Sequence, residues 1–205
     1  MSYSDFKTLE QVLSAYPLQI QRLRFLPDTR VELPEWFLDN LDFSLRTQSE
    51  SESEEFFCEN FIYPFLHQAW KHHAEKLKLW SHRPLNVDER LFGVPDYFVA
   101  YWPDGVMDKL IYTPILAIAE AKRDDFISGW AQCLAEMIAC QKLNADESLT
   151  VYGIVSSGII WQFGKLERQV FTRDLRSCSV ADNPHKVAGL LDHVFAACKS
   201  QLGTA

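Results

Sequence analysis

Two short acidic motifs have residue types suited to metal-assisted chemistry on phosphate. Asp96 follows a Gly-Val-Pro tripeptide, and Glu120-Ala-Lys122 ends an apolar run 24 residues later. Because side chains alternate across a β-strand, Glu120 and Lys122 project from one face while Ala121 points into the packing behind them. If the strand carrying Asp96 pairs beside this one, two carboxylates and an ammonium meet at one sheet edge. A hard divalent cation and an anionic substrate need that combination, so the spacing predicts a metal-dependent phosphodiesterase site.

The elements around these motifs indicate an α/β protein. Apolar residues at helical spacing predict a helix over 3–15. Ser51 and Glu54 form a capping box that would begin a helix over 52–79, kinked at Pro64. Strands are expected over 87–102, 115–121, 149–155, 158–163 and 169–172, with helices over 126–143 and 186–200. The strand over 115–121 is apolar throughout and is expected to be central.

Length and charge limit the organisation and the partners. The 205 residues fit one domain, with an N-terminal preface (1–46), a core (50–165) and a C-terminal strand and helix (166–205). A net charge of −8 argues against a chain that coats nucleic acid, but it leaves room for a local basic rim. The candidates for that rim are Arg83, Arg90, Lys109, Lys122, Arg123 and Lys165.

Other features indicate location and exclude further sites. The apolar runs are far shorter than the ~20 residues of a membrane span, and no secretory signal is recognisable, so we expect a cytoplasmic protein with no membrane partner. The five cysteines form no Cys-x-x-Cys pair and are interpreted as reduced core residues. His67, His72 and His73 have a spacing that favours a solvated helix end over a zinc site.

The motifs resemble those of the PD-(D/E)xK nuclease superfamily, and the chain looks like a compact member of bacterial or cyanobacterial type. Asp96 matches the first motif, Glu120-Ala-Lys122 the second, and Gln132 the glutamine that many members carry on the next helix. The resemblance covers about residues 50–165. It implies a restriction-endonuclease-like fold, in which a central mixed β-sheet is flanked by helices in αβββαβ order.

The resemblance also implies a catalytic set. Asp96, Glu120 and the backbone carbonyl of Ala121 would hold Mg²⁺ or Mn²⁺ with waters. Lys122 would orient the attacking hydroxide or stabilise charge on the phosphate, a contribution of ~3 kcal/mol at comparable sites. Gln132 would position Lys122 or a water.

A helix glutamate completes the set that the resemblance implies. Glu54, Glu55 and Glu59 all precede the first motif on one predicted helix. Glu55 and Glu59 share a helix face with Ile62 and Leu66, so Glu59 is preferred and Glu55 comes second.

Simpler interpretations stay open for several residues. Asp96 also suits a turn, and Glu120 with Lys122 also suits a surface charge pair. Asp124 and Asp125 favour a helix cap over metal ligation. The tryptophans favour core packing over base stacking, and these are Trp102, Trp130 and Trp161.

The sequence therefore predicts a divalent-metal-dependent endonuclease, with DNA as the expected substrate and RNA as the alternative. The alternatives are a catalytically silent nucleic-acid or protein interaction module of the same fold, and a phosphohydrolase acting on a smaller nucleotide. No sequence-reading motif is recognisable, so specificity is expected from nucleic-acid shape or from a partner protein. Two-strand cutting would call for a homodimer, and the apolar hairpin 151–163 is a candidate interface.

Overall fold

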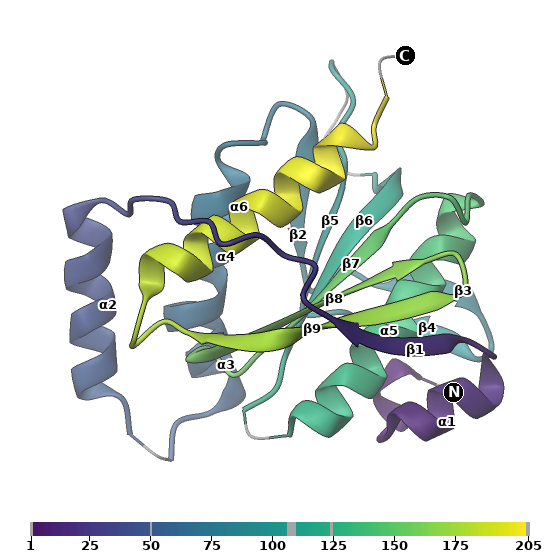
Figure 1. Ribbon diagram of the computed structural model, residues 1–205, viewed down its shortest axis with the longest axis horizontal. Helices are drawn as coiled ribbons and strands as arrows, with labels where there is room; N and C mark the ends of the chain where they lie inside the picture. The colour runs from purple at the N-terminus through teal and green to yellow at the C-terminus, as the bar shows by residue number, and fades with distance from the viewer. Residues whose placement is uncertain (1, 50, 106–109, 124, 204–205) are drawn as a thin grey trace.

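The computed structural model describes residues 2–49, 51–105, 110–123 and 125–203, in which one large mixed sheet is covered by helices on both faces (Figure 1). The strand order is β1-β9-β8-β7-β6-β5-β2, with β1/β9 and β6/β7 parallel and the other pairs antiparallel. The strands are β1 (Gln19–Leu23), β2 (Leu77–Ser81), β5 (Tyr97–Tyr101), β6 (Tyr112–Ala121), β7 (Val151–Ser156), β8 (Ile160–Glu167) and β9 (Val170–Ser179). The predicted α/β class with a large mixed sheet is confirmed.

Two hydrophobic cores, one on each face, hold the helices to the sheet. The first core includes η2 (Cys58–Ile62), α4 (Tyr63–Trp70) and α6 (Pro184–Ser200), and the second includes α1 (Leu9–Ala15) and α5 (Phe126–Asn144). The remaining helices are η1 (Tyr3–Asp5), α2 (Glu35–Thr47) and α3 (Glu54–Phe57), and a separate hairpin pairs β3 (Leu85–Asp88) with β4 (Leu91–Gly93). The two termini of the chain lie on different sides of the molecule (Figure 1).

Strand β6 is the expected central strand, lying between β5 and β7. Residues 115–121 are buried along their whole length because helices cover both faces of the sheet. Ala117, Ala119 and Ala121 face the α4/α6 core, whereas Ile115 and Ile118 face the α5 core. Tyr97 pairs with Ala119 in the antiparallel neighbour β5. This register brings the two acidic motifs to the same end of the sheet.

Helix α5 follows β6 closely and packs against it with small residues. The Asp125 side chain accepts a hydrogen bond from the Ser128 amide at 3.0 Å, so Asp125 is the helix cap that the sequence favoured. Ala131, Ala135 and Ala139 are fully buried against the sheet. Asp124, the other candidate cap, lies outside the described residues.

The predicted helix over 52–79 is wrong in both its start and its end. Ser53, rather than Ser51, caps the helix by accepting from the Phe56 amide at 3.3 Å. Helix α3 continues through a π-helical turn, η2, into α4, where Pro64 sits in the first turn without kinking a longer helix. The helix ends at Trp70, and Leu77 already belongs to strand β2, whose apolar residues alternate between the two faces of the sheet.

The N-terminal preface contributes more to the fold than the sequence indicates. The predicted helix over 3–15 is divided into η1 and α1. Beyond it, β1 adds a parallel edge strand beside β9, and α2 packs beside η2. Phe37 and Leu41 anchor α2 in the core. The preface thus supplies one edge of the sheet and one end of the molecule.

The hairpin 151–163 is interior, which corrects its interpretation as an interface. It forms β7 and the start of β8, and β6 and β9 pair with its outer edges. Its side chains Val151, Ile154 and Phe163 are buried, so a second chain has no access to them. The two tryptophans Trp130 and Trp161 are also core residues. All five cysteines are free and buried, as predicted.

Candidate active site

Asp96 and Glu120 lie opposite one another at the ends of β5 and β6. The ladder pairs Phe98 with Ile118 and Tyr97 with Ala119, so the next positions along it are Asp96 and Glu120. Residues opposite each other in an antiparallel pair project from the same face, which here is the face that α5 covers. The Asp96 Oδ2 atom accepts a hydrogen bond from the Ala121 amide at 2.8 Å. This bond fixes the first carboxylate beside the second.

The Glu120 carboxylate is buried without hydrogen bonds. The residue is 1% exposed, and neither carboxylate oxygen has a hydrogen-bond partner among the described residues. Burial, together with the charges of Glu136 and Asp96, raises the pKa of Glu120 well above its ordinary value, and Lys122 opposes this shift. A buried carboxylate that lacks hydrogen bonds is costly, so these oxygens require a cation or a proton.

Lys122 is the cation nearest to Glu120 in the described part of the chain. Its Nζ atom lies 3.1 Å from Glu120 Oε1, within ion-pair distance but not aligned as a hydrogen bond, and 3.4 Å from Glu54 Oε1. Burial lowers the pKa of Lys122, but the Glu120 and Glu54 carboxylates outweigh burial and raise it, so the ammonium is charged at neutral pH. The side chain is 20% exposed. Lys122 therefore connects the buried acid to the surface.

Gly129 on α5 leaves the space through which the Lys122 stem passes. A Cβ atom at Gly129 would lie 2.7 Å from Val155 Cγ1 and 2.9 Å from Lys122 Cγ. Both separations are shorter than carbon atoms tolerate. The first turn of α5 therefore approaches β6 and β7 closely only because residue 129 has no side chain.

Helix α5 contributes a third acid that the sequence analysis missed. Gln132 Nε2 donates a hydrogen bond to Glu136 Oε1 at 3.4 Å, and the other Glu136 oxygen is buried without a partner. Burial and then the Asp96 charge raise the pKa of Glu136. Gln132 therefore lies next to an acid, and no described contact links it to Lys122. The sequence signal that would have identified Glu136 is its position three residues after Cys133 and four before Cys140, which places it on an apolar helix face.

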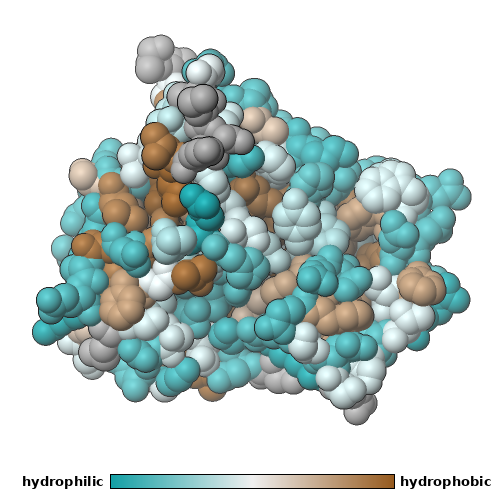
Figure 2. Space-filling view, turned by 180° about the vertical axis from the view of Figure 1, so that it is seen from behind, coloured by the Kyte–Doolittle hydropathy of each residue, from teal (hydrophilic) through white to brown (hydrophobic). Residues whose placement is uncertain are grey.

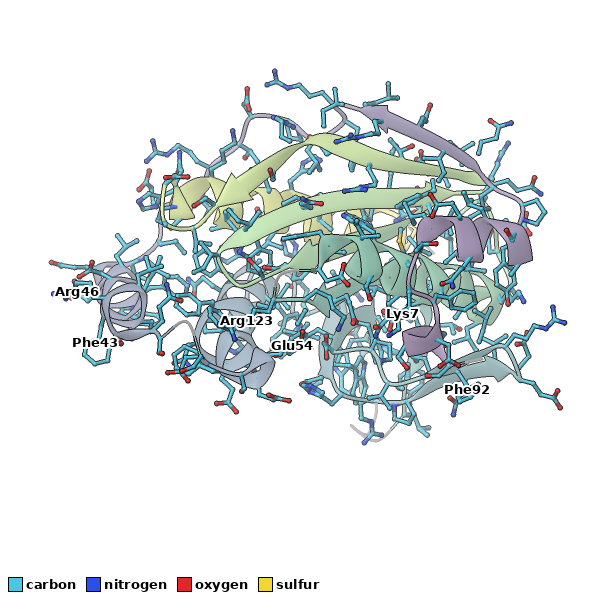
Figure 3. All side chains as sticks on the ribbon, turned by 90° about the horizontal axis from the view of Figure 1, so that it is seen from below. Lys7, Phe43, Arg46, Glu54, Phe92 and Arg123 are labelled. Atoms are coloured by element: carbon cyan, nitrogen blue, oxygen red, sulfur yellow. The ribbon has the colours of Figure 1, made fainter. Side chains whose placement is uncertain are left out.

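The helix acid beside the site is Glu54, whereas the sequence favoured Glu59 and then Glu55. Glu54 pairs with Lys122 from the N-terminus of α3 (Figure 3). Glu55 and Glu59 were predicted to face inward with Ile62 and Leu66, but both glutamates are exposed. The buried residues at this end of the segment are Phe57, Cys58 and Phe61. Both acids line a pocket of about 510 Å³ beside the site. Burial of Ile62 and Leu66 was predicted correctly.

His82 is a second residue that the sequence analysis did not identify. It follows β2 in a left-handed conformation, with φ of 49°, which is uncommon for a residue other than glycine. Its Nδ1 atom lies 2.7 Å from Ser81 Oγ, and its Nε2 atom lies 3.8 Å from Asp96 Oδ1. His82 also lines the pocket with Glu55 and Glu59. Strand β2 was missed, so no sequence signal placed His82 near Asp96.

The basic residues are spread out and do not form one rim. Lys122 and Arg123 lie at the site, and Arg83 follows β2 at the same end of the sheet. Arg90 lies in the β3–β4 hairpin, whose Asp88 pairs with Lys142 near the far end of α5. Lys165 is further along β8 and pairs with Glu167. Lys109 lies outside the described residues.

The histidine cluster packs between helices. His72 Nδ1 and His73 Nε2 lie 2.8 Å and 3.1 Å from the same oxygen of Asp192 on α6. His67 lies elsewhere on α4, against Tyr63 and Trp70. In the described part of the chain, no group of three or more His, Cys, Asp or Glu side chains is arranged to hold a metal ion.

Although no three such side chains converge in the residues that the structure describes, the chemistry of Asp96 and Glu120 at the sheet edge suits a hard divalent cation. The side-chain donors there are carboxylate oxygens, which Mg²⁺ and Mn²⁺ prefer. The two Glu120 oxygens lack hydrogen bonds, and Asp96 keeps Oδ1 for a further partner while Oδ2 binds the Ala121 amide. Two carboxylates with the Ala121 carbonyl and waters would provide a shell that does not need a third acidic side chain.

No protein-family model matches the chain, and no curated protein matches it either. In the described residues, no helix has the length and apolar character needed to cross a membrane. The geometry of the sheet edge is therefore the basis for the functional argument.

Proposed function

We propose that this chain is a divalent-metal-dependent nuclease that hydrolyses phosphodiester bonds, with DNA as the expected substrate and RNA as the alternative. The observation that carries the proposal is the meeting of Asp96, Glu120 and Lys122 at one end of β5 and β6. Two carboxylates suit a hard cation, and an ammonium beside them suits the negative charge of a phosphate. The same chemistry also suits a phosphohydrolase that acts on a smaller nucleotide. Cleavage of nucleoside triphosphates, but not of DNA or RNA, would distinguish that enzyme from a nuclease.

Each residue has a distinct role in this proposal. A bound Mg²⁺ or Mn²⁺ would supply Lewis acidity and would lower the pKa of a water molecule bound to it. Asp96, oriented by the Ala121 amide, and Glu120 hold the cation with the Ala121 carbonyl. Lys122 holds positive charge where the phosphate would bind, and Glu54 orients its ammonium from the helix side. Gln132 positions Glu136 behind these groups.

The order of elements supports a restriction-endonuclease-like fold. Helix α4 is followed by β2, β5 and β6 of the main sheet, then by α5 and β7, with the β3–β4 hairpin inserted after β2. This is the αβββαβ order implied by the PD-(D/E)xK resemblance. The site lies at the end of the second and third of these strands, immediately before α5.

One observation favours the alternative, a catalytically silent interaction module of the same fold. Glu120 is 1% exposed, and Lys122 lies between it and solvent. A substrate phosphate would therefore have to displace the Lys122 ammonium from its present position. The sequence retains all three residues, which a silent module has no chemical need to keep.

The test is cleavage of supercoiled, linear, single-stranded and branched DNA, RNA and nucleoside triphosphates, each with Mg²⁺, Mn²⁺ or EDTA. Wild-type protein is compared with Lys122→Ala and with Lys165→Ala, a lysine paired with Glu167 away from the site. We expect metal-dependent cutting that Lys122→Ala reduces about 10²–10³-fold and Lys165→Ala leaves unchanged. Folded wild-type protein that cleaves none of these substrates would overturn the proposal in favour of the silent module.

A further inference from the structure

The end of the molecule formed by α2 contains a second pocket, distinct from the one that Glu55, Glu59 and His82 line. It lies between α2 and the η2–α4 segment and has a volume of about 510 Å³. Its walls include the exposed aromatic residues Trp36, Phe43 and Tyr63, whose exposed fractions are 56%, 63% and 41%. Figure 2 shows apolar side chains among hydrophilic ones around a hollow at this end, on its right-hand side. We call this pocket the aromatic groove.

The aromatic groove adjoins the pocket that contains His82, beside the candidate site. Glu59 and Tyr63 line both, so the two share a wall on the η2–α4 segment. The Tyr63 ring lies 6.1 Å from the ring of Tyr97, the residue after Asp96. An occupant of the groove would therefore lie beside the pocket that contains His82 and the Asp96 end of β5.

The charge of the groove argues against a nucleic-acid occupant. Among its lining residues Glu59 is the only one with a charged side chain at neutral pH, and none is Lys or Arg. Burial, followed by the charge of Lys71, lowers the pKa of His67, so this lining histidine is neutral at pH 7. Aromatic rings that bind unpaired bases normally work with a positively charged groove that follows the backbone. Such a groove is missing from this lining.

The rim of the groove is acidic. On α2, Trp36 and Phe43 lie on one row of the helix surface, and the neighbouring row contains the exposed acids Glu35, Asp39 and Asp42. On the opposite wall, Glu55 and Glu59 are exposed. The basic residue of α2, Arg46, pairs with Asp42 at 2.8 Å (Figure 3). An apolar floor with an acidic rim is complementary to an apolar face flanked by lysine or arginine.

We propose that the aromatic groove binds a basic amphipathic helix of a partner protein. Both walls are helices, so a third helix can lay its apolar face between them with anchors at i, i+3, i+4 and i+7. Its Lys and Arg side chains would meet Asp39 on one side and Glu55 and Glu59 on the other. The bound helix would lie next to the pocket that contains His82, where a partner can restrict or recruit substrate.

The test uses a fluorescein-labelled 18-residue helical peptide with Leu and Phe at those anchor positions and Lys at the flanks. A second peptide keeps the anchors but has Glu flanks. We expect fluorescence anisotropy to show binding of the Lys peptide that is at least 10-fold tighter than that of the Glu peptide and that weakens with salt. Phe43→Ser should weaken binding of the Lys peptide at least 10-fold, whereas Phe92→Ser, at another exposed phenylalanine distant from α2, should not (Figure 3).

A charge reversal on α2 distinguishes binding by charge complementarity from non-specific hydrophobic binding. Asp39→Lys should weaken binding of the Lys peptide and strengthen that of the Glu peptide. Asp39 is exposed, so thermal unfolding should stay close to wild type. Lys122→Ala should bind the Lys peptide normally, which distinguishes failure of the docking proposal from failure of the catalytic one.

Four results would overturn the proposal. The first is no binding of the Lys peptide, and the second is equal binding of the two peptides. The third is binding of an 18-nucleotide oligothymidylate that Phe43→Ser abolishes while the Lys peptide is unaffected, because the groove would then bind unpaired bases. The fourth is a wild-type dimer in sedimentation velocity that Phe43→Ser dissociates, because the occupant would then be a second copy of this chain.

Discussion

Glu120 and Asp174 are two buried acids of the same sheet, and their surroundings are opposite. Asp174 on β9 is 6% exposed and accepts hydrogen bonds from the amides of Phe25 and Leu26 at 3.1 and 3.0 Å, and from the Arg176 amide and Nε at 3.0 and 2.9 Å. Glu120 on β6 accepts none. Burial alone would raise the pKa of Asp174, but the bonds from Arg176 and Leu26 outweigh it and lower the pKa, whereas the pKa of Glu120 is raised.

The difference indicates what each acid does. Asp174 joins the preface, at residues 25–26, to strand β9, and its charge is fully compensated, as in a structural role. Glu120 has an ion pair with Lys122 but no hydrogen bond from the described residues to either carboxylate oxygen, an arrangement that costs stability and is frequent at functional sites. The fold satisfies a buried carboxylate with hydrogen bonds elsewhere in the sheet, so the lack of them at Glu120 supports a functional role.

The largest expected effect is on catalysis at Glu120. Glu120→Gln keeps the shape and removes the charge that would hold a cation, so cleavage by the proposed nuclease should fall about 10³-fold. Stability at pH 8 should rise at the same time, because the variant no longer has to ionise a buried carboxyl. Cleavage rates and thermal melts on the same preparations check both parts. A variant that loses activity and also stability would indicate a structural role, and the contrast with Asp174 would fail.

Asp174→Asn should have the reverse outcome, with stability lost and activity kept. Breaking a buried, charged and hydrogen-bonded pair costs about 3 kcal/mol, which urea unfolding at pH 7 can measure. The folded-state pKa is lowered, so this contribution is present above the unfolded pKa of about 3.9 and disappears as pH falls through the folded value. Wild type and variant should therefore converge at the acid end. A constant difference at every pH would contradict this cause.

Gly129→Ala tests the space between α5 and the ends of strands β6 and β7. The added methyl group would overlap Val155 and the stem of Lys122, so we expect a stability loss of about 2 kcal/mol and a displaced ammonium. Cleavage should fall more than this loss of folded protein explains. Ala131→Ser on the same helix is a control for general disturbance of its packing. Equal activity loss in both variants would contradict a specific effect on Lys122.

Glu136→Gln should give the smallest effect, a gain in stability of about 1 kcal/mol or ~2–4 °C at pH 8. The folded-state pKa of Glu136 is raised, so the cost of its ionisation appears as pH rises through the unfolded value of about 4.3 and grows toward the folded value. The gain should therefore be absent at pH 4 and largest at alkaline pH. Thermal melts between pH 4 and 9 test this, and a gain that is equal at all pH values would contradict it.

The sequence was informative about the site where chemistry and apolar pattern coincide. The apolar run before Glu120 identified the central strand, and the alternation of strand side chains placed Glu120 and Lys122 on one face. Glu136 was missed because a polar residue in a helix is normally assigned to the solvent side. Glu54 was passed over for Glu59 because one helix phase was assumed from Glu55 to Leu66. That phase holds at Ile62 and Leu66 but fails before the π-helical turn, where Phe57 and Cys58 are the buried residues.

Strands β1 and β2 were missed because neither has a local sequence pattern that is specific to a strand. Strand β2 follows a helix with only a short turn between them, and its Leu-Lys-Leu-Trp sequence also continues an amphipathic helix pattern. Strand β1 is exposed at every position, so it has no hydrophobic alternation to recognise. It forms because β9 offers an unpaired edge, and tertiary context of this kind is invisible to local propensity.

The pairing of β1 with β9 also orders events during synthesis. Gln19 pairs with Val170, so the first strand to leave the ribosome has no partner until about 150 further residues have been made. At roughly 5–20 residues per second, that is a wait of about 8–30 s, during which residues 19–23 have no partner strand. Contacts between such distant parts of a chain also slow folding, because the loop between them must close first. The edge strand is therefore expected to be the last part of the sheet to assemble.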